Sequence, residues 1–283
     1  MKAEIWDETA SVYRSAWQMM DGLGRTIQTQ SPYETAGVLV LNDASYNALG
    51  LALYSGLPRT QSGSGGSYFA PNWGSLPHST AAYDALGRTT SITYADSSVE
   101  TLSYSGMRAT AIDRNNHQTV QEGDPFGRLV KVEEYTGTGS FSLYATTTYE
   151  YDVRDLLKKV TDAAGNQTTM VYNGFGRRAS MSDPDMGTWG YSYGVLGTLS
   201  SQTDARGCTT SVAYDDLSRP TQKTYSGPGA CASTPSVAYT YDSTTGGNKG
   251  WGRLTGMTDG SGSSSYFYNA LGQMTSGTQT VES

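Results

Sequence analysis

The sequence has few of the side chains on which most enzyme and metal sites depend. Its 283 residues include two histidines and two cysteines, and only 16% of them are charged. His78 and His117 lie in turn-like segments, and no serine stands in a Gly-x-Ser-x-Gly motif, so a Ser-His-acid triad has little basis. Cys208 and Cys231 lack further ligands at zinc spacing. We expect neither a metal nor a cofactor.

Positive charge and long apolar runs are also scarce. The net charge of −7 argues against nucleic acid as a partner, because phosphates require a Lys/Arg surface. No apolar run approaches the roughly 18 to 20 residues of a membrane span. The segment Met1–Asp7 has no apolar core of a signal peptide. We therefore expect no membrane span and no signal peptide within this segment.

Glycine and tyrosine are abundant instead, and they recur in a phrase. The chain has 34 Gly and 21 Tyr against 5 Phe, and the fullest copy of the phrase is Tyr83-Asp84-Ala85-Leu86-Gly87-Arg88. Four copies are spaced by 21 residues, at Tyr151, Tyr172, Tyr193 and Tyr214. Looser copies begin at Met20, Tyr46, Tyr83, Gly123, Tyr241 and Tyr268. A fixed period in this range indicates repeats that bury one another's faces.

Each repeat reads as two strands and two turns. Thr, Val, Tyr and Ser fill the segments between turn signals, and pairs such as Tyr149/Tyr151 and Tyr191/Tyr193 share one face because alternate strand residues do so. The fold class is therefore all-β, with tandem β-hairpin repeats forming a curved or spiralling sheet. We predict a single array over residues 1–283, with a strand-like lead-in at 1–19 and loop insertions at 56–80 and 136–147.

The phrase supplies the turn. Its Asp or Asn accepts hydrogen bonds from nearby backbone, and its Gly permits a positive φ. Asp155 and Ser218 replace that Gly, so we expect local distortion without loss of the hairpin. We expect the leucine or phenylalanine of the phrase to pack under the turn, at Leu23, Leu49, Leu86, Phe126, Phe175, Leu196, Leu217 and Leu271. The predicted structural anchors are Tyr83, Asp84, Gly87, Arg88, Tyr151, Asp152, Tyr172, Asn173, Gly176, Arg177, Tyr193, Gly197, Tyr214, Asp215, Tyr241, Asp242, Tyr268, Asn269 and Gly272.

Two smaller features have alternative interpretations. Cys208 and Cys231 follow turn signals of neighbouring units, so they could form a disulfide or remain unpaired, and spacing alone does not decide. Asp183 and Asp259 lie in oxygen-rich loops that could hold calcium. Because both occur in the turn register, we interpret them as turn residues.

The phrase, the segments Thr161–Gly165 and Thr203–Gly207, and the period near 21 resemble the YD repeats of bacterial RHS proteins. Similar repeats occur in the C component of insecticidal toxin complexes, in wall-associated proteins and in teneurins. The resemblance covers about residues 20–275. It implies a long strip of β-hairpins coiled into a hollow shell around a toxin domain, or a surface scaffold for adhesion and glycan contact. Complete shells of this type are several times longer, so the resemblance implies that the chain forms part of a curved wall.

Two functions follow as hypotheses. The first is a structural segment of an RHS-type shell that scaffolds or encloses an effector domain in a larger secreted or cell-surface protein. Its expected partners are the rest of that shell, the effector domain, or a second copy of the chain that associates through the sheet edges. The second is a module that binds or hydrolyses glycans through acids and aromatics. Catalysis would then use carboxylates, although no nucleophile can be named. The candidate ligand contacts are Trp73, Tyr68, Glu133, Tyr135, Tyr149 and Glu150, and Trp73 could equally belong to a loop that folds over the sheet.

Overall fold

The protein is an all-β array of antiparallel strands in a computed structural model that describes residues 2–7 and 12–281. Within these residues there is no α-helix, and the helical turns are the short 3-10 segments η1 (Gly229–Ser233) and η2 (Thr245–Gly247). The described strand pairs are all antiparallel. The predicted fold class is confirmed.

The chain forms two compact units, residues 1–146 and 147–283. Strands of the first unit are β1 (Lys2–Asp7), β2 (Val12–Met20), β3 (Thr26–Pro32), β4 (Val38–Tyr46), β5 (Ala52–Gly56), β6 (Arg59–Ser62), β7 (His78–Tyr83), β8 (Thr89–Thr93), β9 (Val99–Ser105), β10 (Arg108–Ile112), β11 (Gln118–Gly123) and β12 (Leu129–Thr136). Strand β13 (Ser142–Tyr151) begins in the first unit and ends in the second. The prediction of a single array stays a prediction.

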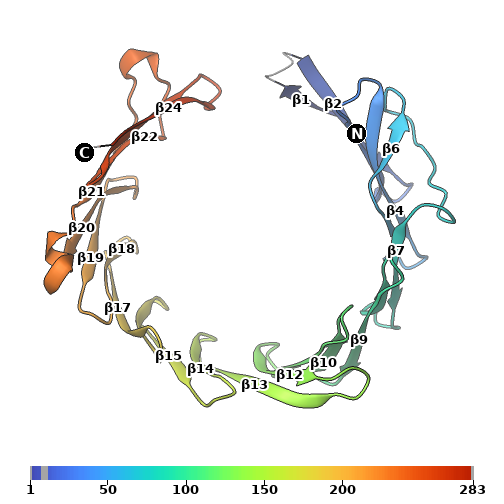
Figure 1. Ribbon diagram of the computed structural model, residues 1–283, viewed down its shortest axis with the longest axis horizontal. Coiled ribbons are helices and arrows are strands. Elements are labelled where there is room, and N and C mark those ends of the chain that lie inside the picture. The colour runs from blue at the N-terminus through green and yellow to red at the C-terminus, as the bar shows by residue number, and fades with distance from the viewer. Residues whose placement is uncertain (1, 8–11, 282–283) are drawn as a thin grey trace. The chain divides into compact units, whose positions relative to one another are not determined.

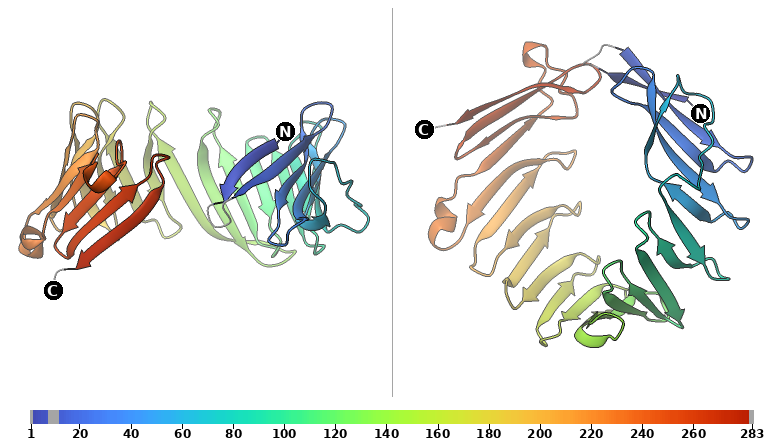
Figure 2. Two further views of the ribbon diagram at one scale, coloured as in Figure 1. Left: turned by 90° about the horizontal axis from the view of Figure 1, so that it is seen from above. Right: turned by 45° about the vertical axis from the view of Figure 1, so that its right-hand side comes forward.

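The second unit continues with β14 (Leu157–Thr161), β15 (Gln167–Tyr172), β16 (Arg178–Asp183), β17 (Gly187–Tyr193), β18 (Leu199–Thr203), β19 (Thr209–Tyr214), β20 (Pro220–Ser226), β21 (Val237–Tyr241), β22 (Leu254–Asp259), β23 (Gly262–Tyr268) and β24 (Met274–Val281). In each unit most consecutive strands lie side by side along an arc, as Figure 1 shows, whereas in the first unit β6 pairs with β4 and β7 pairs with β5. The turns gather at two opposite edges of each unit (Figure 2). Each candidate functional residue of a unit therefore lies either at one of the two turn edges or on one face of the sheet.

Side chains alternate between the two faces of the sheet. One face carries the phrase tyrosines and their neighbours, with cross-strand pairs such as Met170 with Met181 and Tyr191 with Gln202. The opposite face pairs small residues, for example Ser192 with Ser201 and Ser201 with Ser211. Among the described residues, the buried apolar side chains are Leu39, Leu41, Val120 and Met170. Stability therefore depends on half-buried aromatic rows and on hydrogen bonds more than on a closed core.

Segments at the predicted boundaries differ partly from expectation. The lead-in forms strands over its described part, 2–7 and 12–19. Within 56–80, β6 takes residues 59–62 and β7 begins at His78, so the loop itself covers 63–77. Likewise β13 begins at Ser142, which shortens the predicted insertion at 136–147 to a loop at 137–141. The run Thr146-Thr147-Thr148 is β-branched, which favours the strand over a loop.

Candidate functional site

Nine of the ten copies of the phrase end in the same five-residue turn, which we call a YD turn. The copy at Tyr241 ends in a longer loop, in which the Asp242 N–H donates to the Arg253 carbonyl over 3.2 Å. Asp84 shows the geometry: its N–H donates to the Arg88 carbonyl over 2.9 Å, and the Gly87 N–H donates to the Asp84 carbonyl over 3.0 Å. The Asp84 Oδ1 accepts the backbone N–H groups of Leu86 (2.9 Å) and Arg88 (3.0 Å). One carboxylate thus satisfies donors that the turn would otherwise leave free.

The turn also shifts the strand register by one residue. Gly87 has a φ of 78°, a conformation that glycine adopts without a Cβ clash. A bulge lies immediately before the first turn residue in every YD hairpin of the described chain. Asp155 and Ser218 adopt φ values of 64° and 60° and keep the turn hydrogen bonds, so the hairpins persist there. With the longer loop at Asp242 included, the ten YD turns begin at Asp21, Asn47, Asp84, Asp124, Asp152, Asn173, Gly194, Asp215, Asp242 and Asn269.

The arginine that closes a YD turn links it to its neighbour. The Arg88 Nε donates to Asp84 Oδ2 over 2.7 Å, and its guanidinium lies 4.2 Å from the ring centre of Tyr104. The same stacking joins Arg25 to Tyr46, Arg177 to Tyr193, Arg219 to Tyr241 and Arg253 to Tyr268. Such contacts contribute about 0.5–1 kcal/mol at exposed sites. The arginine of the phrase therefore couples successive hairpins.

The tyrosine hydroxyl makes a second link in the opposite direction. Tyr172 donates to the Leu157 carbonyl over 2.7 Å, and Tyr214 donates to the Leu199 carbonyl over 2.9 Å. Each acceptor lies at the start of the strand after the preceding YD turn. Equivalent bonds come from Tyr46, Tyr83, Tyr104, Tyr241 and Tyr268. We call the Asp, Arg and Tyr contacts together the YD ladder.

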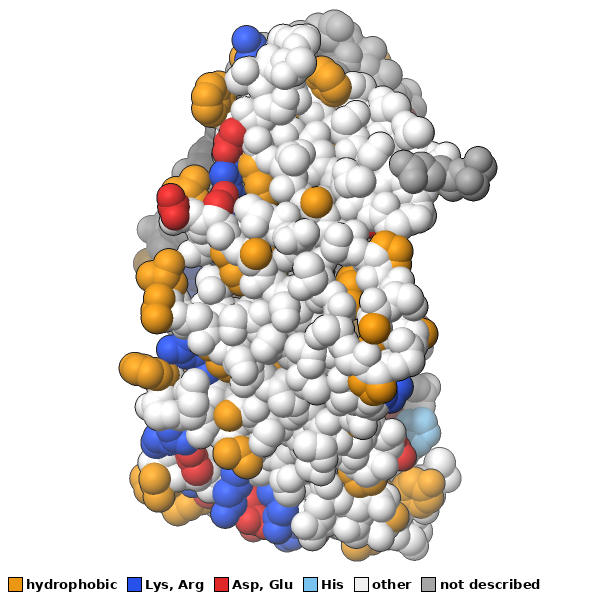
Figure 3. Space-filling model, turned by 90° about the vertical axis from the view of Figure 1, so that its left-hand side faces the viewer, with side chains coloured by type: hydrophobic (Ala, Val, Ile, Leu, Met, Phe, Trp, Pro, Cys, Tyr) orange, Lys and Arg blue, Asp and Glu red, His pale blue; other side chains and the backbone are white. Residues whose placement is uncertain are grey.

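The expected position of the phrase leucine or phenylalanine is wrong. These side chains do not pack under the turn, because they stand at its tip, where the backbone directs them outward. Their exposed fractions are Leu23 78%, Leu49 75%, Leu86 79%, Phe126 79%, Phe175 84%, Leu196 75%, Leu217 72% and Leu271 81%. Figure 3 shows apolar side chains protruding along one edge of the second unit beside charged ones. The YD edge therefore carries a row of exposed apolar tips.

The 63–77 loop folds back onto the first unit. Gln30 donates to the Ser67 carbonyl over 2.6 Å and accepts the Gly66 N–H over 2.9 Å, while Gln28 binds both backbone groups of Phe69. Both glutamines are almost fully buried. Their side-chain amides donate hydrogen bonds to the loop backbone and accept hydrogen bonds from it, as the backbone of a neighbouring strand would. Sequence reasoning missed this network, although two glutamines spaced by two on an inward-facing strand were a signal.

Trp73 and Tyr68 lie in this loop. The Trp73 ring centre is 5.2 Å from that of Tyr54 and 5.4 Å from that of His78, so the indole packs on β5 and β7. Tyr68 is 48% exposed, and burial of its hydroxyl, with the nearby Asp43 carboxylate, raises its pKa. The geometry fits a loop that covers the sheet. A ligand contact for either residue stays a prediction.

The remaining predicted contacts do not all lie on one face of the sheet. Tyr149 and Glu150 are consecutive strand residues and point to opposite faces, so they cannot line a shared site. Glu133 binds Arg108 (2.6 Å), Lys131 (3.0 Å) and the hydroxyl of Tyr135 (3.1 Å).

Both acids have a lowered pKa. The Lys131 ammonium is the main cause for Glu133, and Lys159 for Glu150. A glycosidase acid has a raised pKa, and neither of these carboxyls does. A ligand contact for Glu133, Tyr135, Tyr149 or Glu150 stays a prediction.

The other chemistry-bearing residues serve the turns. His78 Nδ1 lies 2.7 Å from the Leu76 carbonyl, and His117 Nδ1 lies 3.2 Å from Asp113 Oδ2 within a turn. Asp183 and Asp259 accept backbone N–H groups of their own turns. The described residues contain no group of three or more His, Cys, Asp or Glu placed to hold a metal ion. Among them there is also no helix long and apolar enough to span a membrane.

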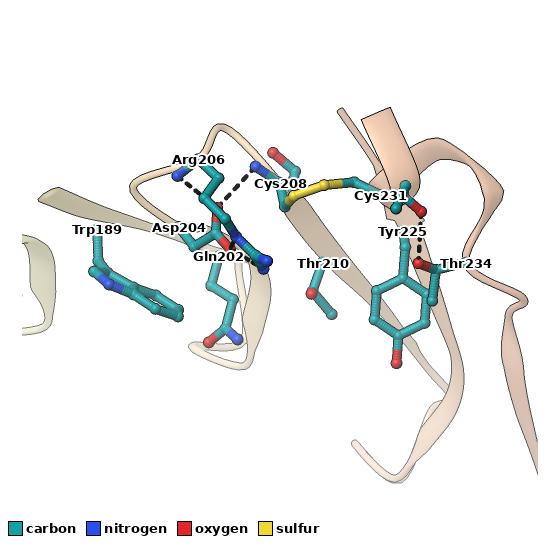
Figure 4. A pocket seen from close by; sticks show the side chains of 11 residues that line it. Trp189, Gln202, Asp204, Arg206, Cys208, Thr210, Tyr225, Cys231 and Thr234 are labelled. Carbon is teal, nitrogen blue, oxygen red and sulfur yellow. Dashed lines mark hydrogen bonds and ion pairs between the residues drawn. A yellow bond between two sulfur atoms is a disulfide. The ribbon is translucent and has the colours of Figure 1, made fainter. Parts of the chain in front are cut away.

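Cys208 and Cys231 form a disulfide, with their Cα atoms 5.6 Å apart, within the usual range. It joins the turn after β18 to η1 and forms one wall of a pocket of about 360 Å³. Trp189, Gln202, Thr210 and Tyr225 line this pocket, as Figure 4 shows. Sequence reasoning missed the pocket, because its residues come from four strands.

Comparison with known proteins finds a repeat family in two regions of the chain. Residues 151–188 and 250–282 match the family model named RHS Repeat, which confirms the predicted repeat identity in these regions. No curated protein sequence matches the chain significantly.

Solved structures match the fold over nearly the whole chain. The TcdB2-TccC3-Cdc42 structure matches with a TM-score of 0.79 and 15% identity, over 95% of this chain. TcdB2-TccC3 alone matches at 0.79 and 14% identity, and the Photorhabdus luminescens Tc holotoxin pore with a TccC3 variant at 0.75 and 14% identity, each over 95% of this chain. The chain spans about 15% of the length of the first of these. These similarities establish the fold.

Proposed function

We propose that this RHS-repeat chain is a wall segment of a β-shell that encloses an effector domain. The YD ladder carries the proposal, because it repeats one set of links from hairpin to hairpin and serves no discrete reaction centre. Similarity to the fold of the TcdB2-TccC3 structures supports it. The whole shell would lie in a larger secreted or cell-surface protein, for which a disulfide is suitable.

The wall extends sideways at its YD edge. Eight of the ten YD turns carry one of these tips, and where consecutive hairpins both carry one, the tips are two strand spacings, or roughly 10 Å, apart. Gaps between tips can therefore accept the tips of a second YD edge. The charges beside them are already paired within the turns, as in Asp84 with Arg88 and Asp215 with Arg219. A second strip of the same repeats, from the parent shell or from another copy, is thus the partner that fits.

Self-association tests the edge contact. A variant with Leu196, Leu217 and Leu271 changed to Ser should lower the mass measured by light scattering at high concentration, whereas wild type should show dimers or larger species. The matched control changes Val171 and Met186 to Ser, which are 58% and 54% exposed but lie away from YD turn tips. Equal masses for all three proteins would refute the edge contact.

Protection of a linked reporter domain tests enclosure. The full chain carrying a reporter at its C-terminus should slow tryptic digestion of that reporter in its associated form, and the tip variant should lose this protection. A reporter digested as quickly as the free domain would contradict the proposal. Glycan hydrolysis is not favoured, because Glu133 and Glu150 are ion-paired and have lowered pKa values.

A further inference from the structure

The pocket beside the disulfide has a floor made by four successive strands. Gln202 on β18 pairs with Thr210 on β19, and Thr210 pairs with Tyr225 on β20. Trp189 on β17 lies two residues before Tyr191, the partner of Gln202, so it shares their face. In Figure 4 the two aromatic side chains flank the amide and the hydroxyl. Three strand spacings separate β17 from β20, or roughly 14 Å.

The polar groups of this floor are available to a ligand. Within the described residues no hydrogen bond reaches the side chains of Gln202, Thr210 or Tyr225. Other groups around the pocket are satisfied: the Trp189 Nε1 donates to the Met186 carbonyl over 3.1 Å, which fixes the indole. Thr234 donates to the Ala230 carbonyl over 3.0 Å. The free donors and acceptors thus lie between two aromatic side chains.

The pocket carries no uncompensated charge. Asp204 binds Arg206 Nη2 over 2.7 Å and also accepts the backbone N–H groups of Arg206 and Cys208. The Arg206 guanidinium keeps the pKa of Asp204 below its usual range, which keeps the pair ionised and mutually neutralised. An ionic ligand would therefore find no unpaired counter-charge. The chemistry fits a neutral ligand with many hydroxyl groups.

An extended peptide fits this floor less well. Peptides that add to a sheet require a free strand edge. Strands β17, β18 and β19 are each hydrogen-bonded on both sides, so the floor offers side chains only. Sugar rings, in contrast, present C–H faces to aromatic planes and hydroxyl groups to amides and hydroxyls.

We propose that the pocket bounded by Trp189 and Tyr225 binds a neutral oligosaccharide. Trp189 stacks on one ring, Gln202 and Thr210 hydrogen-bond to hydroxyl groups in the middle, and Tyr225 contacts the far end. The disulfide holds η1 as the wall beside Tyr225. The volume of about 360 Å³ is within the range of small-molecule sites. This site is independent of the shell proposal.

Calorimetric titration of the 283-residue chain with cellotetraose and with chitotetraose tests the site. We expect at least one sugar to bind with a Kd on the order of 1 mM or tighter. Trp189→Ala should weaken that affinity at least roughly tenfold, since a large stacking surface is lost. Gln202→Ala should weaken it by a factor of about five through loss of one hydrogen bond. Thermal melting of each variant verifies folding. If Trp189→Ala does not fold, the sugar affinity of Gln202→Ala tests the site.

Trp251→Ala is the matched control, because Trp251 is 68% exposed and lies outside the pocket. Its affinity should equal that of wild type. The proposal is overturned if neither sugar gives a binding signal when its concentration reaches about ten times the expected Kd. It is also overturned if Trp251→Ala weakens binding as much as Trp189→Ala. Tighter binding of the uncharged peptide Gly-Ser-Gly-Ser, capped at both ends, would overturn it in favour of a peptide site.

Discussion

Arg219 and Asp242 join two consecutive YD turns through an ion pair of 2.6 Å between Nη2 and Oδ2. The same guanidinium binds Asp215 of its own turn over 2.7 Å and lies 4.4 Å from the ring centre of Tyr241. One side chain therefore contacts both acids and the tyrosine of the next hairpin. These contacts of Arg219 join neighbouring hairpins at the sheet surface, as packing in a buried core does in other folds.

Acid should weaken the array. Hydrogen bonds from the Arg219 backbone and side chain lower the pKa of Asp215, and the Arg219 side chain lowers that of Asp242. Because the folded pKa values lie below the ordinary 3.8, the unfolded chain takes up protons first as the pH falls. Unfolding free energy from urea titrations should be constant well above pH 3.8 and decrease below it. The Asp215→Asn/Asp242→Asn variant should show a shallower decrease, and an equal slope would contradict this role.

Removing one ladder hydroxyl should destabilise the fold modestly. Tyr214→Phe deletes the hydrogen bond to the Leu199 carbonyl and keeps the ring, so we expect a loss of about 1 kcal/mol in unfolding free energy. Tyr239→Phe is the control, because the Tyr239 hydroxyl makes no hydrogen bond within the described residues, and its change should stay within about 0.5 kcal/mol. Chemical unfolding of both variants distinguishes them. Equal effects would mean that the hydroxyl bond adds nothing.

Gly194 offers a stabilising change. Its YD turn keeps both backbone hydrogen bonds but has no side chain to accept the N–H groups that Asp84 accepts elsewhere. A Cβ at this position would meet only Thr198, the closest atom at 3.4 Å. Gly194→Asp should therefore add about 1 kcal/mol to the unfolding free energy.

Gly197, in the same turn, provides the contrast. It has a φ of 88°, and Gly197→Ala should lower the melting temperature where Gly194→Asp raises it. Thermal melting of the two variants beside wild type gives the comparison. A decrease for both would show that this turn does not follow the geometry of the Asp turns.

The disulfide should stabilise the second unit. Closing the loop between Cys208 and Cys231 corresponds to about 3 kcal/mol in the chain-entropy account. The Cys208→Ser/Cys231→Ser variant should therefore unfold at lower urea concentration and bind sugar more weakly, because η1 is no longer held. Wild type treated with a reductant is the comparison. An unchanged urea midpoint in both cases would contradict the prediction.

Much of this architecture can be predicted from the phrase. Asp, Gly and Arg at fixed positions specify a five-residue turn, and alternation places the tyrosines on one face. Tyr104 was missed, although it lies 21 residues after Tyr83 and donates to the Thr89 carbonyl as the others do. Its turn has two residues at Gly106 and Met107 and lacks the Asp, so the phrase is unrecognisable there.

Other features depend on contacts that sequence spacing does not encode. The exposure of Leu86 follows from the direction of the turn tip, which composition cannot give. Gln28 and Gln30 bind a loop about 40 residues away, and Trp189 and Tyr225 line one pocket only through the register of four strands. Long-range register therefore determines the pocket, whereas local chemistry determines the turns.

Coupling between consecutive turns is most directly measured by a double-mutant cycle at Arg219 and Asp242. Unfolding free energies of wild type, Arg219→Gln, Asp242→Asn and the double variant should show that the double variant loses less than the sum of the single losses. A second cycle, with Arg219→Gln and the distant Asp162→Asn, should be additive. Additivity in both cycles would mean that neighbouring hairpins are not joined through this ion pair, and would contradict the ladder.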